Sequence, residues 1–241
     1  MKRFLALVST GVLLGSLVVL AVPSPASAWV LSASPFVFIG ARDECGSPYP
    51  PGSLIVTSQW MWGLGLPDSG GGNTTNTINP TNPDTKGDPH KGLLLSKNGP
   101  TSDCSAAGAE IHGEEGMPVD PGFYLGFDYR NGGHCGGGAP RFNVEFKDPL
   151  GADGFSFVGN CAVAATSPAV QDPLEWTTLR WSVSNPAQAF PPIPVGSTIT
   201  AINIIFDEGT DQPGAEDPRG IGLATIDNIN INGAIIRAGD N

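Results

Sequence analysis

The sequence predicts an all-β protein, an antiparallel jelly-roll β-sandwich with long Gly/Pro-rich loops. Ten short runs of apolar and β-branched residues recur along the chain, with turn residues between them. Glycine and proline together make up 56 of the 241 residues, and no segment has a helical period longer than two turns. Short strands joined by such connections fold most simply into two packed antiparallel sheets.

The N-terminus has the pattern of a secretory signal peptide. Lys2 and Arg3 precede an apolar run, 4–22, and a small-residue A-S-A sequence follows at 26–28. We therefore expect residues 1–28 to be removed before Trp29 and the protein to be secreted to the extracellular space. The alternative is an uncleaved membrane anchor, because the run is almost long enough to span a bilayer. Two prolines after the run favour cleavage, so we do not expect the mature chain to be membrane-embedded.

About 213 residues remain after this cut, and we expect 29–241 to form a single β-sandwich domain. The expected strands are 53–62, 92–97, 107–112, 123–130, 140–146, 154–160, 176–183, 198–207, 222–230 and 233–237. In 198–207, Ile199, Ala201, Asn203 and Ile205 are expected on one face, with Ile202, Ile204 and Phe206 on the other, which predicts a strand buried on both faces. Segment 67–89 has almost no apolar side chains and is expected to be a flexible loop insertion, or else a binding loop ordered by a ligand or ion.

All four cysteines lie in the exported part of the chain, where disulfides persist. They are Cys45, Cys104, Cys135 and Cys161. An even number in an exported chain predicts two disulfides, with three possible pairings. The pairings Cys135–Cys161 and Cys45–Cys104 are favoured because each joins segments that are near in sequence. The absence of a C-x-x-C spacing makes a structural zinc site a poor interpretation.

The sequence NGGHCGGGAPRFNV at 131–144 places His134 beside Cys135 among glycines. Glycine permits positive φ angles, so the segment predicts a hairpin turn between 123–130 and 140–146 that a disulfide pins. His134 and Arg141 are candidate binding residues at the rim of this turn. Arg141 is expected to pair with Asp128 across the hairpin, or with a carboxylate of a ligand.

The charge of the chain limits its partners. The net charge is −11, and without residues 1–28 the chain carries 10 Lys and Arg against 23 Asp and Glu, a net charge of −13. Nucleic acid is therefore not expected as a partner, because phosphate binding relies on clustered cations. An acidic secreted chain is compatible with divalent cations, neutral polymers or cationic surfaces.

Acidic residues crowd the stretch 207–228, which also contains flexible Gly/Pro-rich sequence. Oxygen ligands of this kind suit calcium, and we expect Asp207, Asp211 and Asp217 as ligands, with Asp227 as the fourth. The calcium would be structural. The alternative is a solvated acidic turn, since the spacing differs from that of an EF-hand loop.

The ending GLATIDNININGAIIR resembles the last strands of galactose-binding-like jelly rolls in extracellular carbohydrate-binding modules. The resemblance is carried by Ala224, Ile226, Asp227, Asn228 and Ile229, followed by the turn Asn232-Gly233, over about 20 residues. It implies a jelly roll, and with it a structural calcium ion or a glycan ligand.

Two tryptophans on one expected strand, Trp60 and Trp62, are two residues apart and share a face. A same-face pair suits stacking against sugar rings, whereas the alternative interpretation is that both are core residues. Extracellular glycan binding without catalysis is therefore the leading function. The first alternative is a structural or surface-interaction protein without a small ligand.

A secreted carbohydrate-active enzyme is the second alternative. Such an enzyme needs two carboxylates across a cleft, and a pair from Glu110, Glu114, Glu115 and Asp128 would be the candidate. The chain contains neither an H-E-x-x-H nor a G-x-S-x-G pattern.

Overall fold

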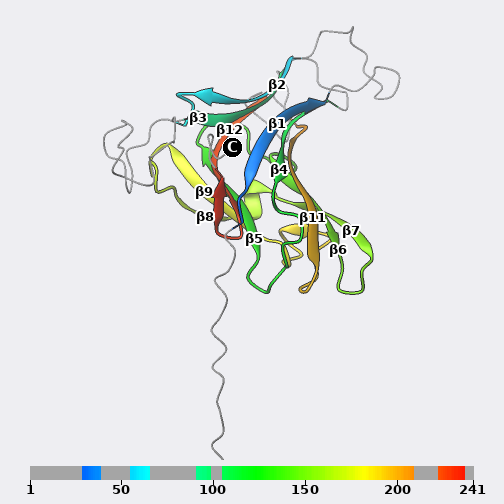
Figure 1. The fold of residues 1–241 in the computed structure, drawn as a ribbon. Coiled ribbons are helices and arrows are strands. Elements are labelled where there is room, and N and C mark those ends of the chain that lie inside the picture. The colour runs from blue at the N-terminus through cyan, green and yellow to red at the C-terminus, as the bar shows by residue number, and fades with distance from the viewer. Residues whose placement is uncertain (1–28, 39–54, 66–90, 99–104, 209–221, 237–241) are drawn as a thin grey trace, which may run out of the picture.

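The computed structural model describes residues 29–38, 55–65, 91–98, 105–208 and 222–236. These residues form two antiparallel sheets packed face to face, which confirms the predicted β-sandwich (Figure 1). The predicted signal peptide 1–28, the predicted loop insertion 67–89, Cys45, Cys104, Asp211 and Asp217 lie outside the described residues.

Sheet A has six strands and sheet B has seven. In spatial order, sheet A consists of β1 (Ser32–Phe38), β4 (Ala106–His112), β11 (Thr198–Phe206), β6 (Arg141–Lys147), β7 (Asp153–Val158) and β10 (Ala189–Phe190). Sheet B consists of β2 (Ile55–Trp62), β3 (Lys91–Asn98), β12 (Leu223–Ile231), β5 (Tyr124–Arg130), β9 (Trp176–Ser182) and β8 (Ala165–Pro168), and β13 (Ala234–Ile236) pairs with β12. A single 3-10 turn, η1 (Cys161–Val163), follows β7, and no described helix is long and apolar enough to cross a membrane.

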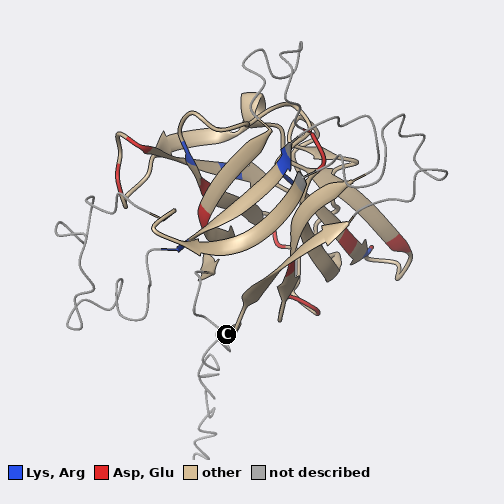
Figure 2. Ribbon diagram, turned by 90° about the horizontal axis from the view of Figure 1, so that it is seen from above, with Lys and Arg blue, Asp and Glu red and all other residues tan. Residues whose placement is uncertain are grey.

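The core lies between the two sheets. Phe127 of β5, Phe142 of β6 and Trp181 of β9 are fully buried there, with ring centroids 5.1–6.2 Å apart. Because β5 and β9 belong to sheet B and β6 to sheet A, these three rings join the sheets. Figure 2 shows few charged residues along the strands, as expected for layers that bury one face each.

The predicted hairpin between 123–130 and 140–146 is wrong. β5 pairs with β12 and β9 in sheet B, whereas β6 pairs with β11 and β7 in sheet A. The glycine-rich segment 131–140 therefore carries the chain from one sheet to the other. Alternation identifies a strand but not its partner, which is why the sequence favoured the nearest one.

The predicted facing of 198–207 is also wrong in part. Ile199 and Ile202 are both fully buried, because the pairing register with β6 shifts between Ile199 and Ala201. Such a bulge inserts one extra residue and turns the preceding side chain to the other face. Asn203 and Ile205 on the outer face are half-buried rather than buried.

Candidate functional site

The outer face of sheet A carries a row of side chains that crosses all six strands. Each residue is the register partner of the next. In order across the sheet the residues are Ser34, Glu110, Asn203, Asn143, Phe157 and Phe190. Adjacent strands lie about 4.8 Å apart, so this outer row extends over roughly 24 Å.

The middle of the outer row consists of two asparagine amides. Asn203 of β11 and Asn143 of β6 lie directly opposite each other, and both are half-buried. Asn143 Oδ1 accepts a hydrogen bond from Arg141 Nε at 3.1 Å. The side chain of Asn203 makes no hydrogen bond within the part of the chain that the structure describes. The amide of Asn203 and the Nδ2 donors of Asn143 are therefore available to a bound molecule.

Phenylalanines form the β7–β10 end of the outer row. Phe157 is 43% exposed and Phe190 is 76% exposed. Phe155, which is two residues from Phe157 on β7, packs edge-on against its ring with centroids 4.9 Å apart. Large aromatic side chains held open to solvent on a sheet edge mark an interaction surface rather than part of the core.

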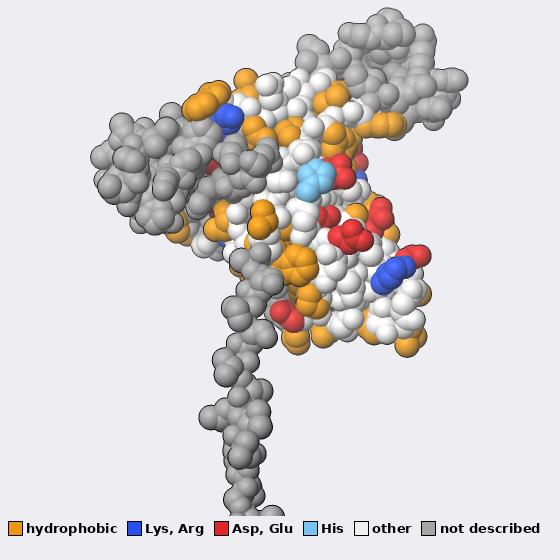
Figure 3. All heavy atoms as spheres, in the orientation of Figure 1, with side chains coloured by type: hydrophobic (Ala, Val, Ile, Leu, Met, Phe, Trp, Pro, Cys, Tyr) orange, Lys and Arg blue, Asp and Glu red, His pale blue; other side chains and the backbone are white. Residues whose placement is uncertain are grey.

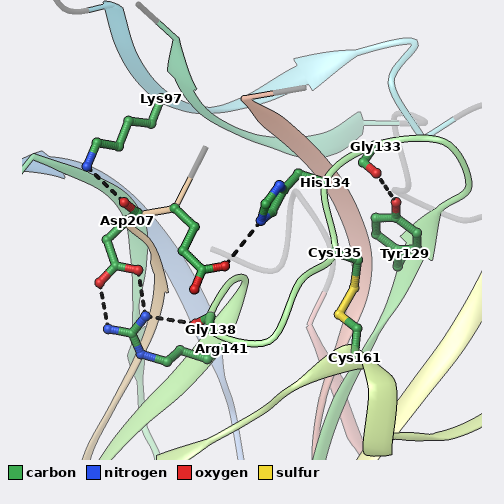
Figure 4. A network of polar contacts seen from close by, with 10 residues as sticks. Lys97, Tyr129, Gly133, His134, Cys135, Gly138, Arg141, Cys161 and Asp207 are labelled. Carbon is green, nitrogen blue, oxygen red and sulfur yellow. Dashed lines mark hydrogen bonds and ion pairs between the residues drawn. A yellow bond between two sulfur atoms is a disulfide. The ribbon is translucent and has the colours of Figure 1, made fainter. Parts of the chain in front are cut away.

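Arg141, one of the predicted binding residues, begins β6 beside the outer row. Its guanidinium donates to both carboxylate oxygens of Asp207, at 2.6 and 2.7 Å, and to the carbonyl of Gly138 at 2.8 Å (Figure 4). The predicted ion pair with Asp128 does not form, because Asp128 lies on the outer face of sheet B. The guanidinium also lies 5.2 Å from the ring centroid of Phe157. Arg141 is thus rigidly held, and its charge is balanced by Asp207.

His134, another predicted binding residue, lies inside the molecule. It is 2% exposed, its Nε2 is 3.3 Å from Glu208 Oε2, and its ring packs edge-on against Phe206. The predicted Cys135–Cys161 disulfide is present and joins the 131–140 segment to η1. Lys97 Nζ donates to the carbonyl of Asp207 at 2.8 Å, so the end of β11 is held from both sheets (Figure 4).

A pocket of about 200 Å³ opens beside the outer row, between the ends of β6, β7 and β10. Arg141, Phe157 and Phe190 line it together with Gly159, Asn160 and the turn before β10. Its volume is below the ~300–1,000 Å³ that is typical of small-molecule sites, so it suits one chemical group rather than a whole ligand.

A hydroxyl, an imidazole and a carboxylate meet at the β1–β4 end of sheet A. His112 Nε2 lies 3.0 Å from Ser34 Oγ, and His112 Nδ1 lies 4.0 Å from Glu110 Oε1. All three side chains are exposed. Figure 3 shows a histidine beside acidic side chains on this face of the molecule.

The predicted carboxylate pair is divided between the faces of the sandwich. Glu110 is on the outer face of sheet A, whereas Asp128, next to the buried Phe127, is on the outer face of sheet B. Glu114 is buried, and its Oε1 accepts a hydrogen bond from Ile202 N at 3.2 Å, just after the β11 bulge. Burial raises the pKa of Glu114, and the backbone hydrogen bonds oppose that rise. Glu115 is exposed.

The two predicted platform tryptophans have different surroundings. Trp60 is half-buried against the core, and its Nε1 donates to the carbonyl of Ala33 at 3.1 Å. Trp62 is 70% exposed, with Lys91 Nζ 5.0 Å from its ring centroid. Only Trp62 of this pair offers a ring to solvent.

The predicted calcium ligands that the structure describes are Asp207 and Asp227. Asp207 is bound by Arg141, as above, whereas Asp227 is 4% exposed and is the register partner of Asp128 in sheet B. Among the described residues, no three His, Cys, Asp or Glu side chains are grouped to hold a metal ion.

Sequence reasoning missed Asn143, Asn203, Phe157 and Phe190. The alternation in 154–160 predicted the strand, but it places Phe155 and Phe157 on one face and Ser156 and Val158 on the other. Hydrophobicity alone favours the phenylalanines as the inward set, and the structure has them outward. No signal in the sequence reveals this inversion before the pairing of the strands is known.

Comparison with known proteins gives no match. No family model, no curated protein and no solved structure is significantly similar to the chain. Its function is therefore inferred from the residues of the outer row and of the pocket beside it.

Proposed function

We propose that the protein is a secreted, non-catalytic glycan-binding protein whose ligand lies along the outer row of sheet A. The observation that carries the proposal is the combination, in one row, of two amides with two exposed phenylalanine rings. Sugars present apolar C–H faces, which pack on aromatic rings, and hydroxyl edges, which exchange hydrogen bonds with amides. A row of roughly 24 Å accommodates several sugar units in line.

The ligand is expected to be a neutral glycan. The chain carries a net charge of −11, and Asp207 balances the charge of Arg141 beside the row. An acidic polysaccharide would meet repulsion from the molecule as a whole without a compensating cation at the site.

The test is the binding of neutral oligosaccharides and polysaccharides by the mature protein, measured by calorimetry and affinity electrophoresis. F190A should weaken binding about tenfold, or ~1.4 kcal/mol. L174A is the matched control, because Leu174 is also highly exposed, at 85%, but precedes β9 of sheet B. If W62A abolishes binding and F190A does not, the site is at Trp62. If a broad glycan panel gives no binding, the protein is of the surface-interaction class.

One observation favours an enzyme as the second candidate. Ser34, His112 and Glu110 supply a hydroxyl, a base and a carboxylate in the order that nucleophilic ester hydrolysis uses. These three groups would serve a hydrolase that acts on ester groups of a bound glycan. Release of acetate from acetylated polysaccharide by the wild type, but not by S34A or H112A, tests this candidate. Equal rates for the wild type and both variants would remove it.

A further inference from the structure

The pocket beside the outer row exists because residue 159 is a glycine. Gly159 is opposite Arg141 on β6, and its N donates to the carbonyl of Gln188 at 3.0 Å. A Cβ at position 159 would lie 2.7 Å from Arg141 Cβ, so any side chain here would occupy the hollow. The pocket is therefore a gap in the side-chain layer of sheet A, open to a group that projects from a ligand on the outer row.

Arg141 and Asn160 bring hydrogen-bond donors to the pocket. Four of the five N–H groups of Arg141 are used, by Asn143, Gly138 and Asp207, so one remains. Asn160 has a positive φ of 75°, and its Oδ1 accepts from Ala162 N at 2.9 Å. Among the described residues, the amide Nδ2 of Asn160 has no hydrogen-bond partner. Because Asp207 already balances the charge of Arg141 and the Asn160 amide is neutral, these donors suit an uncharged acceptor oxygen of a ligand.

Gln188 also lines the pocket, but its Nε2 donates to the carbonyl of Val163 and its Oε1 accepts from Ser182 N. The remaining side chains of the lining are apolar. Phe157 and Phe190 form one side, and Pro186 and Ala187 belong to the turn before β10. A group that fits here combines a small apolar part with a neutral carbonyl oxygen. The acetamido group has this composition, with a methyl group for the apolar walls and an amide oxygen for Arg141 and Asn160.

We propose that this pocket receives the acetamido group of an N-acetylated hexosamine in the bound glycan. This inference rests on the proposed function and names its substrate class. A site built to donate hydrogen bonds to a ligand group discriminates against an analogue without that group, because its buried donors then remain unpaired.

The experiment compares chitin-derived and cellulose-derived oligosaccharides of equal length, which differ in an acetamido group or a hydroxyl at C2. Calorimetry on the wild-type protein should give at least tenfold tighter binding of the acetylated series. N160D keeps the acceptor for Ala162 N but replaces the donor, and it should lose this preference. N185D is the matched control, because Asn185 also accepts from a backbone amide, Ala187 N, but does not line the pocket.

A second variant, A187L, narrows the pocket from an exposed turn position and should also abolish the preference. Equal binding of the two series by the wild type would overturn the acetamido assignment and leave glycan binding intact. If the preference for the acetylated series survives in both N160D and A187L, the acetamido group binds elsewhere and the pocket assignment is wrong. Failure of the wild type to bind either series or any other glycan would overturn the proposed function itself.

Discussion

The carboxylate of Glu208 occupies space that glycine leaves open in the 131–140 segment. A Cβ at Gly138 would lie 1.9 Å from Glu208 Oε1, and one at Gly136 would lie 2.9 Å from Glu208 Oε2. These glycines thus allow the backbone to approach a side chain that contacts His134. Their role is to accommodate the end of β11 rather than to form a hairpin turn.

G138A should lower the free energy of unfolding by about 1–2 kcal/mol, because Glu208 must move away and its contact with His134 is lost. G137A is the matched control, since a Cβ at Gly137 meets nothing within 4 Å. In the E208A background, G138A should cost little, and urea unfolding of the four proteins measures this coupling. Additive effects in the cycle would contradict the contact.

Glu114 should make stability depend on pH in the sense opposite to that of most carboxylates. Burial raises its pKa in the folded state, so the protonated form is favoured there. This stabilisation is fully present below the unfolded-state pKa and is lost as pH rises through the folded-state pKa.

E114Q removes this titration and keeps an acceptor for Ile202 N. The stability of E114Q relative to wild type should therefore rise from pH 4 to pH 7, as measured by urea unfolding. E115Q, at an exposed neighbouring carboxylate, is the control and should show no comparable trend. A difference in the free energy of unfolding between E114Q and wild type that stays constant across this range would contradict the raised pKa of Glu114.

At the scale of elements, the Cys135–Cys161 disulfide connects two segments in which the chain crosses from one sheet to the other. Cys135 lies where the chain passes from β5 in sheet B to β6 in sheet A, and Cys161 lies where it passes from β7 back to β8. Cys161 N also donates to the carbonyl of Gly136 at 3.1 Å, so the two crossings are held side by side.

Replacing both cysteines, in C135S/C161S, should lower the free energy of unfolding by about 3 kcal/mol. The bridge closes a segment with a sequence separation of 26 residues, and its removal lets the unfolded chain gain entropy. Chemical unfolding of variant and wild type without reductant measures the loss. An unchanged unfolding midpoint would mean that the crossings hold together without the bridge.

The elements themselves were largely predictable, but their partners were not. All ten expected strands are present, because each is a short run of apolar and β-branched residues bounded by turn residues. Three strands were not predicted: the short strands β8 and β10, and β1, which has Pro35 in its interior and lies at the edge of sheet A, where proline is tolerated. The bulge in β11 and the sheet crossing at 131–140 depend on tertiary pairing, which no local pattern encodes.

The same limit applies to the site. Arg141 was found because an arginine beside a glycine-rich segment is conspicuous, but its partner Asp207 is 66 residues away. The outer row combines residues from all six strands of sheet A, so it becomes visible only when the register is known.

At the scale of the whole molecule, stabilisation by bound calcium has to be separated from the screening of a net charge of −11. Excess carboxylates repel one another, and any added salt weakens that repulsion. We expect 10 mM calcium to raise the melting temperature by roughly 5 °C and EDTA to reverse it, because an ion bound only by the folded state stabilises it by mass action.

The specific site is distinguished from screening by its ligands. D211N/D217N should remove the calcium effect, whereas D153N, at an exposed carboxylate paired with Lys147, should retain it. Magnesium at equal ionic strength should reproduce only the screening part, since it demands near-ideal octahedral geometry and gives up its water ligands reluctantly. An increase in melting temperature that is the same for both ions, or that persists in D211N/D217N, would mean that calcium acts only by screening the net charge of the chain.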